Sequence, residues 1–221
     1  MRHLIRTHCS ILFSILLITG LAASAAGQKL TKAETLAAEK RLVELGYWLN
    51  KADGVVDAST RHAVTAFQKV EGRKRTGTLS RKDFEALKIA EKPTPRDMPN
   101  KRHIEVDITR QVLFLFDANG EIEKIVPVST GNEERYFQDG KWQVARTVTG
   151  DFTVLRKING VRRAPLGNLY YPLYFYEGWA IHGSNSVPSV PASHGCVRVP
   201  RGADKMLFRI VPIGTPVLVY D

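Results

Sequence analysis

The chain has 221 residues, of which 43% are hydrophobic and 24% are charged, and its formal net charge is +10. This composition is typical of a folded protein and excludes a largely disordered chain. The length accommodates one ordinary domain together with a small one. The basic residues lie in short, scattered clusters without interleaved aromatic residues, so we do not expect nucleic acid as a partner.

Residues 1–26 have the pattern of a secretory signal peptide. Arg2 and Arg6 precede an apolar run over residues 9–21, and the small residues that follow supply a cleavage site. The run is shorter than the roughly 20 residues that a membrane-spanning helix needs, which favours cleavage over a permanent anchor. We therefore expect an exported protein of the periplasm or cell wall, whose basic surface is attracted to anionic envelope polymers.

Residues 30–90 show the pattern of a small domain of three short helices. Apolar residues at helical spacing over residues 36–45 precede Gly46, which is placed to end the first helix. The second helix is expected to begin near Asp57 and the third near Ser80, because both residue types cap helix N-termini.

A proline-rich segment, residues 91–101, is expected to be a stiff linker and a domain boundary. From residue 102 the hydrophobic period changes to two, starting with Ile104, Val106 and Ile108. Strands are expected at residues 104–108, 112–116, 122–128, 152–155, 169–176, 179–181 and 217–220, and a helix at residues 203–209. Residues 102–221 are therefore predicted to form a mainly β domain, a sandwich or barrel-like sheet.

Cys196 is expected to be the only thiol of the mature chain, because the other cysteine, Cys9, lies in the predicted signal peptide. A lone cysteine cannot form an internal disulfide, so it is either a small buried side chain or a reactive group. His182 and His194 lie fourteen and two residues before Cys196. Both histidines are candidate bases that can take the proton of the thiol.

Three further neighbours of this thiol favour a covalent reaction. Ser193 and Gly195 are small, which lets backbone N–H groups approach a substrate oxyanion. Arg198 adds positive charge that favours a thiolate and can bind a carboxylate. The pattern therefore predicts attack of a thiolate on a carbonyl, followed by transfer of the acyl group to an amine or to water.

Two other interpretations of the same segment stay open. His182, His194 and Cys196 supply three metal ligands, although no Cys-x-x-Cys or His-Glu-x-x-His motif accompanies them. Alternatively, the cysteine is a buried side chain in a glycine turn with structural histidines. Covalent catalysis is favoured because two histidines, an arginine and small residues surround one thiol.

Ile-His-Gly at residues 181–183 and Ser-His-Gly-Cys-Val-Arg at residues 193–198 together resemble the signature of the L,D-transpeptidase (YkuD-like) catalytic domain. Supporting motifs, such as Val-Pro-Val-Ser-Thr-Gly at residues 126–131, extend the resemblance over residues 102–220. It implies a mainly β enzyme of peptidoglycan biosynthesis. Such an enzyme cleaves the terminal D-alanine from a tetrapeptide stem, holds the stem as a thioester and transfers it to the amine of a neighbouring stem.

By position, the resemblance makes Cys196 the nucleophile and His182 the general base, and it gives His194 and Gly195 a part in shaping the catalytic site and its oxyanion hole. The residues that it places on the substrate side are Gly183, Ser193 and Arg198. It implies acylation of the same thiol by carbapenem-type β-lactams, and it calls for no metal or organic cofactor.

The helical domain resembles a peptidoglycan-binding domain. The motifs are Leu-Gly-Tyr at residues 45–47, Asp-Gly-Val at residues 53–55 and Thr-Arg-His-Ala-Val-Thr-Ala-Phe-Gln at residues 60–68. Peptidoglycan glycan is therefore an expected partner, and a helical spacer without a ligand is the alternative.

The alternatives for the whole protein keep or discard the catalytic thiol. The same acyl-enzyme serves an L,D-carboxypeptidase or endopeptidase if water is the acceptor, and a lipoprotein-attachment enzyme if a protein lysine is. A general cysteine protease would instead cleave all-L peptides. A non-catalytic cell-wall-binding protein would use only the first domain.

Overall fold

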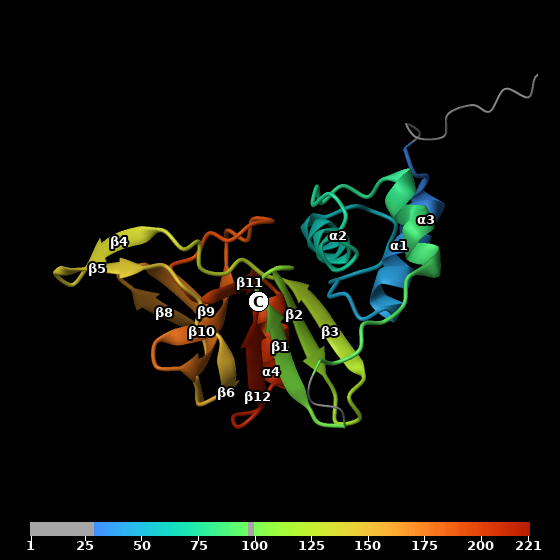
Figure 1. Cartoon of the computed structure of the whole chain (residues 1–221). Helices are drawn as coiled ribbons and strands as arrows, with labels where there is room; N and C mark the ends of the chain where they lie inside the picture. The colour runs from blue at the N-terminus through green and yellow to red at the C-terminus, as the bar shows by residue number, and fades with distance from the viewer. Residues whose placement is uncertain (1–28, 97–99) are drawn as a thin grey trace, which may run out of the picture.

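The computed structural model describes residues 29–96 and 100–221 (Figure 1). The predicted signal peptide lies outside the described residues. Within the described ranges, no helix is both long enough and apolar enough to cross a membrane. Three helices precede a β-rich region that contains one further helix, as the sequence predicts.

The first three helices begin where their capping residues predict. They are α1 (Lys32–Glu44), α2 (Ala58–Val70) and α3 (Arg81–Ile89). Their N-caps are Thr31, Asp57 and Ser80, and each side chain accepts a hydrogen bond from the third helical N–H in a capping box. Gly46 follows α1 with φ +95°, and a Cβ atom there would overlap Ile122 of the β region. A glycine is therefore required where the helical domain approaches the strands.

The β region consists of two packed sheets and a separate hairpin. Its strands are β1 (His103–Asp107), β2 (Val112–Phe116), β3 (Ile122–Pro127), β4 (Arg135–Gln138), β5 (Lys141–Val144), β6 (Gly150–Thr153), β7 (Arg156–Lys157), β8 (Val161–Ala164), β9 (Gly167–Tyr176), β10 (Trp179–Ser184), β11 (Val197–Pro200) and β12 (Pro216–Tyr220). One sheet has the order β3-β2-β1-β12-β6, and the other has the order β11-β10-β9-β7, with β8 also pairing with β9. Helix α4 (Ala203–Ile210) packs against β9, β10 and β11.

The core of the β region lies between the two sheets. Val106 and Leu113 from the first sheet meet Ile181 and Val197 from the second in one buried cluster. Apolar side chains of both inner faces therefore close the sandwich that the hydrophobic pattern predicts.

The first strand is more buried than its alternating sequence suggests. Alternation of apolar and acidic residues indicates a half-exposed strand, but all five residues of β1 are buried. Glu105 lies 3.1 Å from His103 Nε2, and Asp107 accepts hydrogen bonds of 2.6 Å from the Arg110 backbone and guanidinium. Pairing with these groups offsets the cost of burying the two carboxylates.

The helical domain covers the outer face of the first sheet. Leu42 and Phe67 of the helices share a second buried cluster with Phe114, Phe116 and Ile125 of β2 and β3. Figure 1 shows α2 beside these strands. The helices and the sheet are thus joined by a continuous apolar core, in addition to the proline-rich segment.

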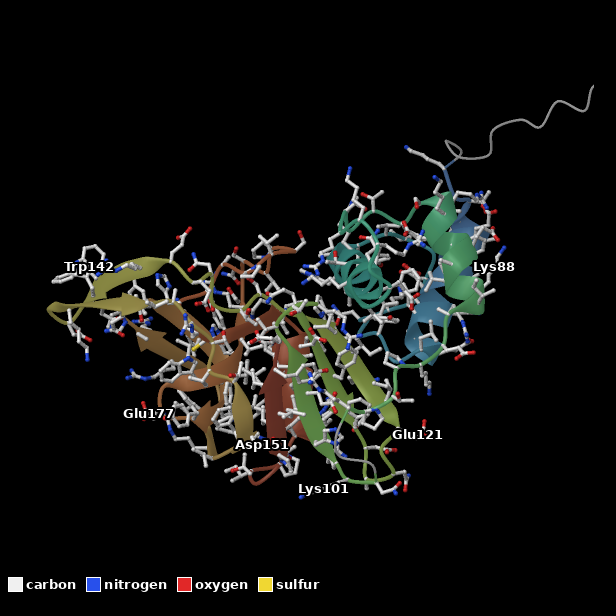
Figure 2. The ribbon with its side chains drawn as sticks, viewed as in Figure 1. Lys88, Lys101, Glu121, Trp142, Asp151 and Glu177 are labelled. Atoms are coloured by element: carbon white, nitrogen blue, oxygen red, sulfur yellow. The ribbon has the colours of Figure 1, made fainter. Side chains whose placement is uncertain are left out.

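Several short strands were not predicted from the sequence. Strands β4, β5, β7 and β8 are two to four residues long and contain no buried residue, so no sustained apolar pattern marks them. The β4–β5 hairpin projects from the sandwich, and Trp142 lies on it at the end of the molecule opposite the helices (Figures 1 and 2). Strand β11 is only four residues long, and β6 begins and ends two residues earlier than predicted.

Candidate active site

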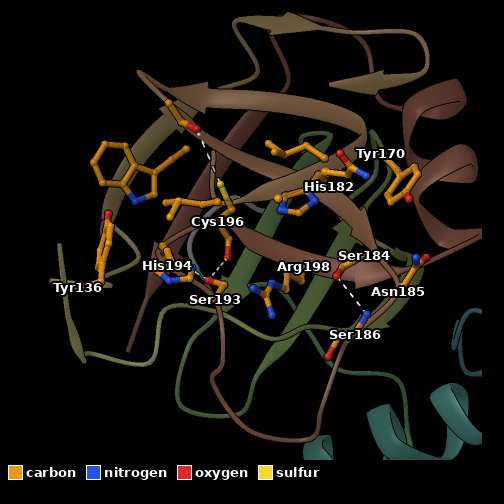
Figure 3. A pocket seen from close by; sticks show the side chains of 17 residues that line it. Tyr136, Tyr170, His182, Ser184, Asn185, Ser186, Ser193, His194, Cys196 and Arg198 are labelled. Atoms are coloured by element: carbon orange, nitrogen blue, oxygen red, sulfur yellow. Dashed lines mark hydrogen bonds between the residues drawn. The ribbon is translucent and has the colours of Figure 1, made fainter. Parts of the chain in front are cut away.

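Two neighbouring parallel strands bring the predicted catalytic residues together. Strand β10 pairs with β11 so that His182 lies opposite Arg198. Cys196 immediately precedes β11, and side chains two residues apart share one face of an extended chain. His182, Cys196 and Arg198 therefore face the same cavity (Figure 3). Folding thus closes the fourteen-residue separation between the histidine and the thiol.

The cavity has a volume of about 470 Å³. The first residues of β9, parts of β10, residues 193–196 and Arg198 supply its walls, and Tyr136 of the β4–β5 hairpin lines one side. Tyr136 was not predicted, because the hairpin that carries it has no recognisable sequence pattern. Its ring lies 4.8 Å from that of His194 in an edge-on contact, and His194 is exposed. The cavity is large enough for a peptide segment.

The Cys196 side chain is held as a thiol at neutral pH. Its Sγ donates a long contact of 3.8 Å to the Gly178 carbonyl. Burial raises the pKa of the thiol, while the Ala180 N–H and the positive charge of Arg198 act in the opposite direction. Arg198 thus favours a thiolate, as its position in the sequence predicts, but burial has the larger effect.

His182 is neutral at the same pH. Its side chain is 6% exposed, and burial lowers the pKa of the imidazole to about 4, with a further contribution from Arg198. Nδ1 lies 2.9 Å from the Gly183 carbonyl oxygen, which can only accept a hydrogen bond. Nδ1 therefore carries the proton, and Nε2 is left as the basic nitrogen.

The loop before Cys196 is fixed by its own hydrogen bonds. Ser193 Oγ donates to the Cys196 carbonyl at 2.6 Å and accepts from the Gly195 N–H at 3.0 Å. Gly195 has φ +136°, and a Cβ atom there would lie 2.7 Å from the Arg146 carbonyl oxygen. Because the Gly195 N–H donates to Ser193 Oγ, it is not free to bind a substrate. Among the described residues, the N–H groups of His194 and Cys196 have no hydrogen-bond acceptor.

Gly183 and Arg198 have different surroundings from each other. A Cβ atom at Gly183 would overlap the buried carboxylate of Asp204, so close packing of α4 on β10 requires glycine here. The Arg198 guanidinium is half-buried beside the cavity and makes no hydrogen bond or ion pair with the described residues. An unpaired cation in this position is suited to a substrate carboxylate.

Metal ligation was the second interpretation of this segment. Within residues 29–96 and 100–221, no group of three or more histidine, cysteine, aspartate or glutamate side chains is arranged to hold a metal ion.

Comparison with known proteins defines the class to which this fold and site belong. The L,D-transpeptidase catalytic domain (YkuD) matches residues 101–219, more than half of the chain, and the protein therefore belongs to the L,D-transpeptidase family. Residues 31–87 match the family described as "Putative peptidoglycan binding domain".

Two relatives illustrate the similarity. The crystal structure of the L,D-transpeptidase (residues 123–326) from Xylanimonas cellulosilytica DSM 15894 is 40% identical, with a TM-score of 0.80 over 85% of this chain and 93% of that chain. The Bacillus subtilis (strain 168) protein named "Putative L,D-transpeptidase YqjB" is 30% identical over an alignment of 145 residues, and the match covers 60% of this chain and 77% of YqjB.

Proposed function

We propose that the protein is an exported peptidoglycan L,D-transpeptidase that forms cross-links through a thioester on Cys196. The observation that carries the proposal is the meeting of a thiol and a neutral imidazole in one cavity, in a chain of the L,D-transpeptidase family. A neutral imidazole is the form of histidine that can accept the thiol proton.

In the proposed acylation step, His182 Nε2 takes the proton of Cys196 as Sγ attacks the carbonyl carbon before the terminal D-alanine of a tetrapeptide stem. The free N–H groups of Cys196 and His194 are the proposed donors to the oxyanion, because Ser193 occupies the Gly195 N–H. Collapse of the tetrahedral intermediate breaks the amide bond. The imidazolium gives its proton to the leaving amine of D-alanine.

In the proposed second step, the side-chain amine of a neighbouring stem attacks the thioester, and His182 takes a proton from that amine. The new amide bond is the cross-link, and the thiolate of Cys196 recovers its proton. Arg198 is proposed to bind a stem carboxylate, since its guanidinium borders the cavity without a protein partner among the described residues. The strained amide of a carbapenem would acylate the same sulfur.

The helical domain is proposed to bind peptidoglycan glycan, because residues 31–87 match a peptidoglycan-binding family. Binding of this polymer would place the protein at the cell wall and raise the local concentration of stems around the cavity.

Intact-mass spectrometry of the protein incubated with a carbapenem tests the proposal. We expect one covalent adduct, located on Cys196 and lost in Cys196→Ala, with the fold of that variant intact. His182→Ala should slow adduct formation far more than His194→Gln does, because only His182 is proposed as the base. Adduct formation by Cys196→Ala, or a larger loss in His194→Gln, would contradict the proposed roles.

A further inference from the structure

A lysine of the helical domain is buried against the β domain. Lys69 of α2 is 1% exposed, and its Nζ donates to the carbonyl oxygens of Gln111 at 3.0 Å and Val128 at 2.8 Å. Burial, together with the nearby charge of Arg75, lowers the pKa of Lys69 to about 7. A buried amine is costly unless it is hydrogen-bonded, so these two carbonyl contacts are structurally significant. The proposed reaction does not use this residue.

The first of these acceptors belongs to a residue with an unusual backbone. Gln111 is 1% exposed and has φ +61°, a left-handed conformation that a residue with a side chain seldom adopts. Its side-chain amide makes two hydrogen bonds with Thr130. Gln111 Nε2 donates to Thr130 Oγ1 at 2.6 Å, and Gln111 Oε1 accepts from the Thr130 N–H at 2.9 Å. The position of Thr130 is therefore set by Gln111.

Thr130 in turn holds the loop that carries the thiol. Its carbonyl oxygen accepts hydrogen bonds from the N–H groups of Ala192 at 2.9 Å and Ser193 at 2.8 Å. The Ser193 hydroxyl then bonds the Cys196 carbonyl. Thr130 and Ser193 are 0% and 2% exposed, so water does not compete for these bonds.

Arg75, from the loop between α2 and α3, makes a second contact of the same kind. It donates to the carbonyl oxygens of Ser189 at 3.3 Å and Thr109 at 3.2 Å. Ser189 precedes the Ser193–Cys196 turn on the same loop. The helical domain thus contacts the active-site loop directly through Arg75, and Lys69 is connected to the same loop through Gln111 and Thr130.

We propose that Lys69 is a positioning residue for the active site, acting through the buried hydrogen-bond chain Lys69–Gln111–Thr130–Ser193. The helical domain then forms part of the catalytic unit, in addition to any binding of glycan. A shift of about 1 Å in a reacting group can lower a rate by about a hundredfold. Loss of the Lys69 contacts is expected to move Cys196 relative to His182 by a fraction of that distance.

The test compares Lys69→Met with Lys40→Met in the full chain, since Lys40 is an exposed lysine of α1 in the same domain. The readout is the rate of alkylation of Cys196 by iodoacetamide, quantified on the peptide that contains it. We expect about a tenfold slower reaction in Lys69→Met and an unchanged rate in Lys40→Met. Equal rates in the two variants would overturn the proposal.

A further variant separates positioning from general stability. Leu87→Ala opens a cavity in the helical domain, because Leu87 is 1% exposed. The carbonyl of Leu87 accepts a hydrogen bond from Arg41, which is not a member of the hydrogen-bond chain. It should lower the melting temperature and leave the alkylation rate unchanged at a temperature where the protein is folded. If Leu87→Ala and Lys69→Met slow alkylation equally for the same loss of stability, the positioning role is refuted.

A double-mutant cycle tests the connection itself. Thr130→Val removes the hydroxyl that accepts a hydrogen bond from Gln111. If both residues act through one chain, the double variant Lys69→Met/Thr130→Val should alkylate Cys196 little more slowly than the slower of the two single variants. If the rate reductions of the two single variants multiply in the double variant, the two residues act independently and the proposed hydrogen-bond chain is refuted. Iodoacetamide needs no peptidoglycan, so this result stands apart from the proposed function. Failure of the wild-type protein to process a stem peptide would contradict the proposed transpeptidase function and leave the positioning role of Lys69 untouched.

Discussion

The buried neutral imidazole of His182 makes the stability of the protein depend on pH. The unfolded chain binds a proton at this histidine near pH 6.5, and the folded protein binds it near pH 4. Between these values the unfolded state holds more protons, so the free energy of unfolding falls as the pH is lowered. A shift from 6.5 to about 4, at about 1.4 kcal/mol per pKa unit, corresponds to a loss of about 3 kcal/mol by pH 4.

Urea denaturation at pH 7 and pH 4 measures this loss. The wild-type protein should lose about 3 kcal/mol more than His182→Gln over this interval, with similar denaturant slopes. His62→Gln is the matched control, because burial also lowers the pKa of His62 but this histidine lies on α2, away from the cavity. The His62→Gln variant should still show the decrease in the free energy of unfolding that depends on His182. Equal losses in wild type and His182→Gln would refute a buried neutral histidine in the folded protein.

Three further predictions concern the site. Ser193→Ala removes two hydrogen bonds and should lower the free energy of unfolding by about 1–3 kcal/mol and slow alkylation of Cys196; wild-type behaviour in both assays would show that the loop does not depend on this hydroxyl. Gly183→Ala forces a methyl group against Asp204 and should cost about 1–3 kcal/mol in urea denaturation, and an unchanged midpoint would contradict the close packing. Because burial raises the pKa of Cys196 above its ordinary value of 9.0, its alkylation rate should still be rising at pH 9, whereas a plateau near pH 6 would reveal a thiolate paired with an imidazolium.

Local sequence signals predicted the helices and the long strands well. Asp57 and Ser80 cap α2 and α3, and the apolar runs at 112–116 and 217–220 become β2 and β12. Exposed strands such as β8 escaped prediction, because their positions are set by pairing with β9 and not by an apolar pattern of their own.

Sequence motifs also predicted part of the candidate site. Its motifs lie close together in sequence, and the parallel pairing of β10 with β11 brings His182 and Cys196 to one cavity. The protonation states depend on burial, which no motif reports, and so the net rise in the pKa of Cys196 was not predicted. Tyr136 and Lys69 reach their places through tertiary packing alone.

Docking of the helices on the sheet also gives a structural explanation for a basic cluster in the helical domain. Three basic residues occupy positions 73–75, between α2 and α3. Arg73 pairs with Asp83 of α3 at 2.9 Å, and Arg75 donates to two carbonyls of the β domain. Arg73 and Arg75 therefore make contacts within the protein.

The most direct test of the proposed transpeptidase activity is mass spectrometry of the protein incubated with a disaccharide-tetrapeptide as both donor and acceptor. We predict release of D-alanine, a thioester on Cys196 and a cross-linked dimer that has lost one D-alanine. Absence of both D-alanine release and a Cys196 adduct, in folded protein with a reduced thiol, would contradict the proposed function. Release of D-alanine without a dimer would identify water as the acceptor and contradict the transpeptidase assignment.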